Sequence, residues 1–302
     1  MGLDKFQSGE RVCFVGDSIT HKGMFIKQIL AYYRKYLPDN KAEFYDCGIA
    51  GGNLENTIKV FDEDIAIYDP THIVLMIGVN DSRFNHLKDP ANERYEFIST
   101  AYEKYKKNIE TFYKMTCERG IKLILCTPVP YAEYADFDTP AVRGAYAVIM
   151  GYANYIRAFA LEKGLDLCDY HTAMTKAMQT EVLYAPDRVH PNEAGHFVMA
   201  KTLLNEQGLE LSEPMKYSED LEKWYEATQK LRNIIAAEYF VVPDYTECSD
   251  EARIETVKKR FDEANRGIND PGEYIRTVMQ RHINFKPHQK ELIDFVKSYM
   301  KK

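Results

Sequence analysis

Four short clusters in the sequence together contain the groups that acyl transfer requires. They are GDSIT at 16–20, GIAGGN at 48–53, GVNDS at 78–82 and DRVHP at 187–191. Acyl transfer needs a nucleophile, a base that takes its proton, a group that orients the base, and hydrogen-bond donors for the developing oxyanion. The clusters supply a hydroxyl, glycine amides, a carboxamide and an Asp/His pair, so every role has a candidate.

Ser18 is the candidate nucleophile and His190 the candidate base. Ser18 follows a predicted strand and opens a predicted helix, a turn that exposes its hydroxyl and the first unbonded N–H groups. Asp187 precedes His190 by three residues, so its carboxylate can fold back onto the imidazole and fix the tautomer. Taken alone, Ser18 is also explained as a helix N-cap. The four clusters together favour the catalytic interpretation, because all of them fall where a parallel sheet opens.

Two further groups are candidates for binding an oxyanion. Gly51 has no Cβ to keep the backbone away from a substrate, and its N–H can point at the oxyanion. The side-chain amide of Asn80 offers another donor.

A parallel sheet is the element that would bring these clusters together. Short apolar runs alternate with longer amphipathic stretches up to about residue 208, which indicates βαβ units and a sheet buried on both faces. Such sheets bind ligands beyond the carboxyl ends of their strands. The predicted strands are 11–16, 42–48, 71–78, 122–129 and 165–170, and the predicted helices lie near 22–36, 53–68, 93–119, 141–163 and 191–206. Pro191 is expected at the first position of the last of these helices. The fold class is therefore three-layer α/β with five parallel strands.

After about residue 212 the strand pattern gives way to helices. They are predicted near 217–239, 249–265, 271–282 and 287–301. No flexible linker precedes them, so we expect an α/β domain over 1–211 and a helical C-terminal extension over 212–302 packed on it. Trp224, the only tryptophan, is the candidate anchor of that packing.

Composition narrows the classes of partner. Lys+Arg 39 against Asp+Glu 46 gives a net charge of −7, which disfavours nucleic acid and anionic membrane surfaces. No stretch resembles a signal peptide or reaches the length of a membrane span, so the prediction is a soluble, cytoplasmic protein. The six cysteines form no CxxC pair and no zinc-like cluster, and we expect buried thiols. No other ligand-type residues lie at metal-site spacing from His171 or His196, so no metal site is predicted.

The four clusters, in this order, resemble the signature blocks of the SGNH, or GDSL-type, hydrolases over roughly residues 10–207. The resemblance implies a flavodoxin-like three-layer fold and a serine esterase mechanism that uses neither metal nor cofactor. It also implies that Ser18, Asp187 and His190 form a catalytic triad. The N–H groups of Ser18 and Gly51 and the side chain of Asn80 would then form the oxyanion hole. Gly52 replaces Gly51 if the loop register differs by one.

Other residues near the predicted site are candidates for the substrate pocket, and packing or surface solvation explains them equally well. They are Asp17, His21, Gly52, Arg83, Phe84 and Arg188. The irregular, aromatic stretch 128–136 is predicted either to shape a pocket or to be an ordered surface loop.

The predicted activity is removal of small acyl groups, foremost acetyl, from sugars or oligosaccharides. The alternatives are a lipase, lysophospholipase or thioesterase for longer acyl chains, and a non-catalytic binding or scaffolding protein that retains the fold. The C-terminal helices offer a surface for homo-oligomerisation.

Overall fold

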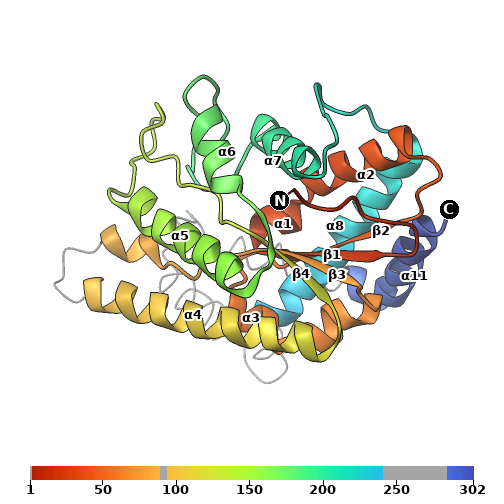
Figure 1. Ribbon diagram of the computed structural model, residues 1–302, viewed down its shortest axis with the longest axis horizontal. Helices are drawn as coiled ribbons and strands as arrows, with labels where there is room; N and C mark the ends of the chain where they lie inside the picture. The colour runs from red at the N-terminus through yellow and green to blue at the C-terminus, as the bar shows by residue number, and fades with distance from the viewer. Residues whose placement is uncertain (1, 89–93, 241–283) are drawn as a thin grey trace.

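Five parallel strands form the centre of the molecule (Figure 1). The computed structural model describes residues 2–88, 94–240 and 284–302. Within them the strand order is β2-β1-β3-β4-β5, with β1 at Arg11–Gly16, β2 at Glu43–Gly48, β3 at His72–Met76, β4 at Lys122–Cys126 and β5 at Asp166–Cys168. Their inner residues are buried, as the apolar runs require. The three-layer α/β prediction is confirmed.

Helices cover both faces of this sheet. They are α1 (Ser18–Lys22), α2 (Met24–Tyr36), α3 (Leu54–Lys59), α4 (Arg94–Glu118), α5 (Ala145–Lys163), α6 (Tyr170–Ala177), α7 (Glu193–Glu206), α8 (Glu219–Phe240) and α11 (Gln289–Met300). In Figure 1, α2 and α7 lie on one side of the sheet and α3 and α4 on the other. The strands end in register, with Gly16 beside both Gly48 and Met76. The clusters that follow them therefore meet at one edge.

Two local predictions at this edge are wrong. The stretch predicted as a strand over 165–170 ends at Cys168, because the Asp169 side chain accepts the Thr172 N–H and starts α6. Pro191 does not open α7. It forms a β-bridge with Tyr184, and the helix begins only after Asn192, whose side chain accepts the Gly195 N–H.

The helix predicted over 53–68 is also divided. Only α3 is α-helical, and it is followed by a π-helical turn at Phe61–Ile65 and a 3₁₀ turn at Ala66–Tyr68. Of the predicted C-terminal helices, α8 and α11 correspond to 217–239 and 287–301, whereas 249–265 and 271–282 lie outside the described residues.

The described C-terminal helices pack on the α/β layers. Helix α8 contacts α1, α2, β2 and α11. Trp224 of α8 is buried and stacks on Tyr299 of α11 with ring centroids 6.0 Å apart. Arg232 of α8, fully buried, forms a two-pronged ion pair with the equally buried Asp64 at 2.6 and 2.8 Å. This part of the C-terminal segment therefore contributes to the core.

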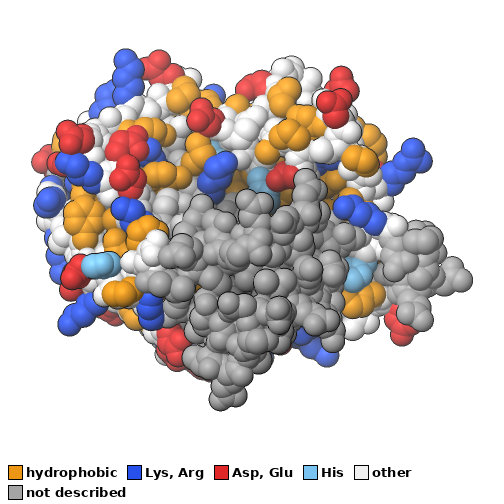
Figure 2. Space-filling model, turned by 180° about the vertical axis from the view of Figure 1, so that it is seen from behind, with side chains coloured by type: hydrophobic (Ala, Val, Ile, Leu, Met, Phe, Trp, Pro, Cys, Tyr) orange, Lys and Arg blue, Asp and Glu red, His pale blue; other side chains and the backbone are white. Residues whose placement is uncertain are grey.

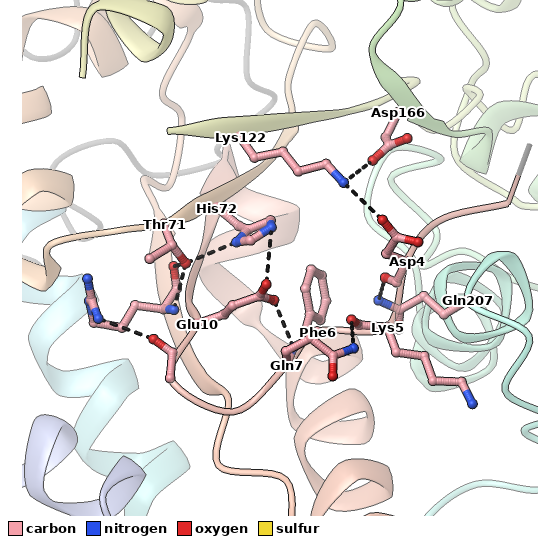
Figure 3. Close-up of polar contacts among 12 residues, drawn as sticks. Asp4, Lys5, Phe6, Gln7, Glu10, Thr71, His72, Lys122, Asp166 and Gln207 are labelled. Atoms are coloured by element: carbon pink, nitrogen blue, oxygen red, sulfur yellow. Dashed lines mark hydrogen bonds and ion pairs between the residues drawn. The ribbon is translucent and has the colours of Figure 1, made fainter. Parts of the chain in front are cut away.

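The opposite, amino-terminal edge of the sheet is held by a network of charged side chains (Figure 3). Lys122 lies between Asp166 at 2.8 Å and Asp4 at 3.5 Å. His72 Nε2 lies 3.8 Å from Glu10 Oε1. These contacts tie the N-terminal segment to the starts of β3 and β4, at the opposite edge of the sheet from the four clusters at its carboxyl edge.

The described surface carries both signs of charge. Acidic and basic side chains are interspersed over the described part of the face in Figure 2. Among the described helices, none combines the length and apolar character needed to cross a membrane.

Of the cysteines that are described, Cys13, Cys47, Cys126 and Cys168 are buried thiols. The same expectation is wrong for Cys117, which is exposed on α4, and Cys248 lies outside the described residues.

Candidate active site

Ser18, His190 and Asp187 form a continuous hydrogen-bonded chain. The Ser18 Oγ lies 2.8 Å from His190 Nε2, and His190 Nδ1 lies 2.7 Å from Asp187 Oδ2. The first contact joins residues 172 positions apart in sequence, so the fold alone creates it. A hydroxyl, an imidazole and a carboxylate in this sequence can transfer a proton from serine to histidine while the carboxylate stabilises the imidazolium.

Asp17, and not Ser18, caps helix α1. The Asp17 side chain accepts the Ile19 N–H at 2.9 Å from the N-cap position, while Ser18 occupies the first helical position. The Ser18 hydroxyl is therefore not the cap of α1, and the N-cap interpretation of this serine is wrong. Gly48 lets α1 come this close to the sheet, since a Cβ on Gly48 would lie 2.0 Å from the His21 nitrogen.

The loop that carries Asp187 and His190 is fixed by its own hydrogen bonds. The Asp187 Oδ1 accepts the N–H groups of Val189 and His190, both at 2.9 Å. The Ala185 N–H donates to the His190 carbonyl at 2.9 Å. Burial alone would raise the pKa of Asp187, but the hydrogen bonds from the His190 side chain and backbone outweigh it and lower the pKa to about 2. The carboxylate is thus ionised at neutral pH, as the orienting role requires.

The loop after β2 and the side chain of Asn80 form the other half of the site. Asn80 Nδ2 donates to the Gly52 carbonyl at 2.8 Å, which ties the two clusters together. The Gly52 N–H donates to the Ile49 carbonyl at 2.8 Å and is therefore committed within the loop. Gly51 adopts a φ of 76°, a conformation that favours glycine. Which of the two glycines donates to an oxyanion stays a prediction.

A family comparison decides the class of this arrangement. The profile of the GDSL-like lipase/acylhydrolase family matches residues 14–197, a span that contains all four clusters. The chain belongs to the GDSL-like lipase/acylhydrolase family. It is a carboxylic ester hydrolase of the SGNH type, as the resemblance implied.

Known proteins similar to this acylhydrolase include both a sequence relative and solved structures. An acetylxylan esterase of Geobacillus stearothermophilus is 25% identical over 223 residues, covering 68% of this chain and 97% of that protein. A crystal structure of the acetylxylan esterase Axe2 from the same organism is 22% identical, with a TM-score of 0.57 over 69% of this chain and all of the other. A gut microbial diltiazem-metabolizing enzyme is 16% identical, with a TM-score of 0.75 over 99% of this chain and 96% of the other.

Several substrate-pocket candidates of this acylhydrolase have packing contacts. Arg188 is buried, and its guanidinium donates to the carbonyls of Ala132, Ala135, Phe137 and Thr139. It thus holds the loop after β4. Phe84 is buried against Tyr131, with ring centroids 5.1 Å apart. The structure favours the packing alternative for both.

The remaining candidates lie close to α1 or β3. His21 is buried at the end of α1, and Asp17 has the capping role given above. Arg83 is partly exposed, with a φ of 52° just after the Asn80 cluster. Gly52 serves the loop through its N–H and carbonyl.

Two residues that contact the end of α1, the helix that carries Ser18, were missed from the sequence. Gln229 Nε2 of α8 donates to the His21 carbonyl at 2.7 Å, and the Tyr225 hydroxyl donates to the Lys22 carbonyl at 2.6 Å. These carbonyls end α1, where helical partners are lacking. The pairs are separated by 208 and 203 residues, so no local pattern could have indicated them.

Among the described histidines outside the Asp187–His190 loop, His171 and His196 are buried. The part of the chain that is described contains no group of three His, Cys, Asp or Glu side chains arranged to hold an ion. Burial lowers the pKa of His171 to about 4 and that of His196 to about 3, so both rings are neutral at neutral pH.

Proposed function

We propose that this acylhydrolase removes small acyl groups, foremost acetyl, from acylated sugars or oligosaccharides, with Ser18 as nucleophile. The observation that carries the catalytic part is the hydrogen-bonded chain from Ser18 through His190 to Asp187. Structures of the Axe2 esterase described as catalytic mutants carry substitutions of a serine, an aspartate and a histidine, the same three residue types.

The reaction proceeds in two steps. His190 Nε2 takes the Ser18 proton as Oγ attacks the ester carbonyl, and the resulting imidazolium then protonates the departing alcohol. Water, deprotonated by His190, attacks the acyl-enzyme carbon and releases the carboxylic acid and Ser18. In both steps negative charge develops on the carbonyl oxygen. The Ser18 and Gly51 N–H groups and the Asn80 side-chain amide are the donors we assign to it.

Three observations support a small acyl group on a sugar. The acetylxylan esterase relative acts, by its name, on an acetylated polysaccharide. The net charge is −7, which disfavours attraction to anionic lipid surfaces. No helix in the described ranges 2–88, 94–240 and 284–302 has the length and apolarity of a membrane span.

Hydrolysis of p-nitrophenyl esters from acetate to palmitate tests the proposal, with wild type compared to Ser18→Ala and His190→Ala. We expect hydrolysis of short-chain esters that both variants lose almost entirely, while circular dichroism shows them folded. Acetate release from acetylated xylo-oligosaccharides then tests the sugar.

Other outcomes would redirect the assignment. A preference for long chains would support the lipase or thioesterase alternative. Ester hydrolysis that survives in folded Ser18→Ala would remove Ser18 as the nucleophile.

A further inference from the structure

A cavity lies beside the loop that carries Asp187 and His190, between the loop that follows β4 and the end of α6. Its volume is about 600 Å³, within the usual range for small-molecule sites. Figure 1 labels α5 and α6, two of the elements that line it. Its walls are residues 131–137, Tyr146 at the start of α5, Thr175 of α6, and residues 178–184 that follow α6. None of these residues belongs to the hydrogen-bonded chain of the active site.

Aromatic and aliphatic side chains form most of the lining, and two of them remain exposed to solvent. Tyr134 is 86% exposed and Val182 is 67% exposed, on the two segments that face each other across the cavity. The ring of Tyr134 lies 6.5 Å from that of Tyr146, centroid to centroid. Large apolar side chains left in water beside a cavity indicate a surface that a ligand covers.

The polar part of the lining is acidic. Both carboxylate oxygens of Glu133 already accept hydrogen bonds, from the N–H groups of Gly144 and Tyr146. Asp136 and Glu181 also line the cavity, and neither carboxylate contacts a hydrogen-bond or ion-pair partner among the described residues. The lining contains no Lys or Arg. The inner wall includes Tyr184, whose buried hydroxyl likewise lacks a partner in the described part of the chain.

The cavity shares its walls with the loop that carries Asp187 and His190. Tyr184 lies three residues before Asp187 and is bridged to Pro191, directly after His190. On the other wall, the Ala132 N–H donates to the Arg188 carbonyl at 3.0 Å. The Arg188 guanidinium fastens residues 132–139 to the same loop. A molecule in the cavity is therefore adjacent to the catalytic loop.

We propose that this cavity binds a sugar ring of the alcohol portion of the ester, with the ring against Tyr134 and its hydroxyls donating to Asp136 and Glu181. The proposal rests on the proposed function and names the residues that would select the substrate. Aromatic faces pack against the apolar face of a pyranose ring, and carboxylates without partners accept its hydroxyl protons. Asp136 and Glu181 are both exposed, and an alkyl chain would cover the same rings but would offer these carboxylates no hydrogen-bond donor. A neutral, hydroxyl-rich ring therefore fits better than a fatty acyl chain.

The test compares two substrates in Tyr134→Ala and in a matched control. The substrates are acetylated xylo-oligosaccharides and p-nitrophenyl acetate, and the control is Tyr36→Ala, which removes a tyrosine 51% exposed on α2. We expect Tyr134→Ala to lower the ratio of kcat/KM for the sugar ester to that for p-nitrophenyl acetate by about three- to tenfold. This corresponds to the loss of one aromatic contact, and the change should appear mainly in KM for the sugar ester. Tyr36→Ala should leave the ratio unchanged.

Direct binding gives a readout that is independent of turnover. Calorimetric titration of xylotriose into Ser18→Ala should show binding that Ser18→Ala/Tyr134→Ala weakens and Ser18→Ala/Tyr36→Ala retains. The proposal would be overturned if Tyr134→Ala changed neither the ratio of the two kcat/KM values nor the affinity for xylotriose. A Tyr134 effect confined to long-chain p-nitrophenyl esters would also overturn it, in favour of an acyl site.

A different result would show that the proposed function, and not the cavity proposal, is wrong. In that case wild type would show no Ser18-dependent hydrolysis of any ester. The xylotriose titration would still decide whether the cavity binds sugar.

Discussion

Asp17 and Ser18 divide between them two roles that serine commonly combines. The Asp17 carboxylate caps α1, and the Ser18 hydroxyl is left to contact His190. A short polar residue before the nucleophile thus has a structural reason, because without it the hydroxyl would compete for the first free amides of the helix.

Asn80 serves both the loop and, in our proposal, the oxyanion. One N–H of its amide holds the Gly52 carbonyl, and the second can point at the substrate. Asn80→Ala should therefore lower kcat by about 10²–10³, the scale for one oxyanion donor. Steady-state kinetics with p-nitrophenyl acetate will measure this. A variant with the kcat of wild type would exclude Asn80 from the oxyanion hole.

Asp46 is a buried acid whose stability effect depends on pH. Its Oδ1 accepts the Gly48 N–H, whereas its Oδ2 is buried without a partner among the described residues. Burial raises the pKa of Asp46 well above its ordinary value of 3.8, although Arg232 opposes this. The neutral form is thus favoured in the folded state. Its contribution to stability is present below pH 3.8 and is lost as the pH rises toward the folded-state pKa.

Asp46→Asn should remove this loss. The variant should be more stable than wild type at pH 8, because a buried amide carries no charge that loses its hydration. The difference should shrink toward pH 4. Urea unfolding at several pH values measures it, and a difference that stays constant with pH would contradict the assigned protonation.

At the scale of elements, α8 supports the helix that carries the nucleophile. Gln229 and Tyr225 satisfy the last carbonyls of α1, which has only five residues and little stability of its own. We expect Gln229→Ala to reduce kcat by up to about tenfold, the equivalent of one hydrogen bond, with KM nearly unchanged because the substrate contacts remain.

Glu222→Gln is the matched control for Gln229→Ala. Glu222 also projects from α8, but it pairs with Lys27 of α2 at 2.6 Å and not with α1. Its kcat should stay close to that of wild type. Equal losses in both variants would show that α8 acts through general stability and not through α1.

The elements differ in how far the sequence could predict them. The five strands were predictable because continuous apolar runs such as that of β1 must be buried on both faces, and the clusters at their ends could be placed at one edge. Helix α6 was missed, because the run over 165–170 continues smoothly in sequence although the Asp169 side chain ends the strand. The contacts of Gln229 and Arg188 depend on tertiary packing, which no local spacing encodes.

Across the whole molecule, a buried ion pair between Arg232 and Asp64 joins the C-terminal segment to the sheet layers. Arg232 and Asp64 are both buried, so each depends on the other for its charge. Arg232→Met should destabilise the protein by about 3–5 kcal/mol, because it leaves Asp64 buried without a partner. Arg232→Met/Asp64→Leu should recover most of that loss.

Chemical denaturation checks this prediction. We expect one transition that shifts as a whole in Arg232→Met. Two separate transitions, with only the later helices affected, would show that the segment folds independently of the sheet.

The Arg232–Asp64 pair also sets an order of events during synthesis. The two residues are separated by 168 positions. A ribosome that adds about 5–20 residues per second needs roughly 10–30 s to go from one to the other. During that interval Ser18 and Asp64 have already been synthesised, but the side chains that contact the end of α1 and pair with Asp64 have not. The contacts that support Ser18 through α1 can therefore form only once residues in the last third of the chain have been synthesised.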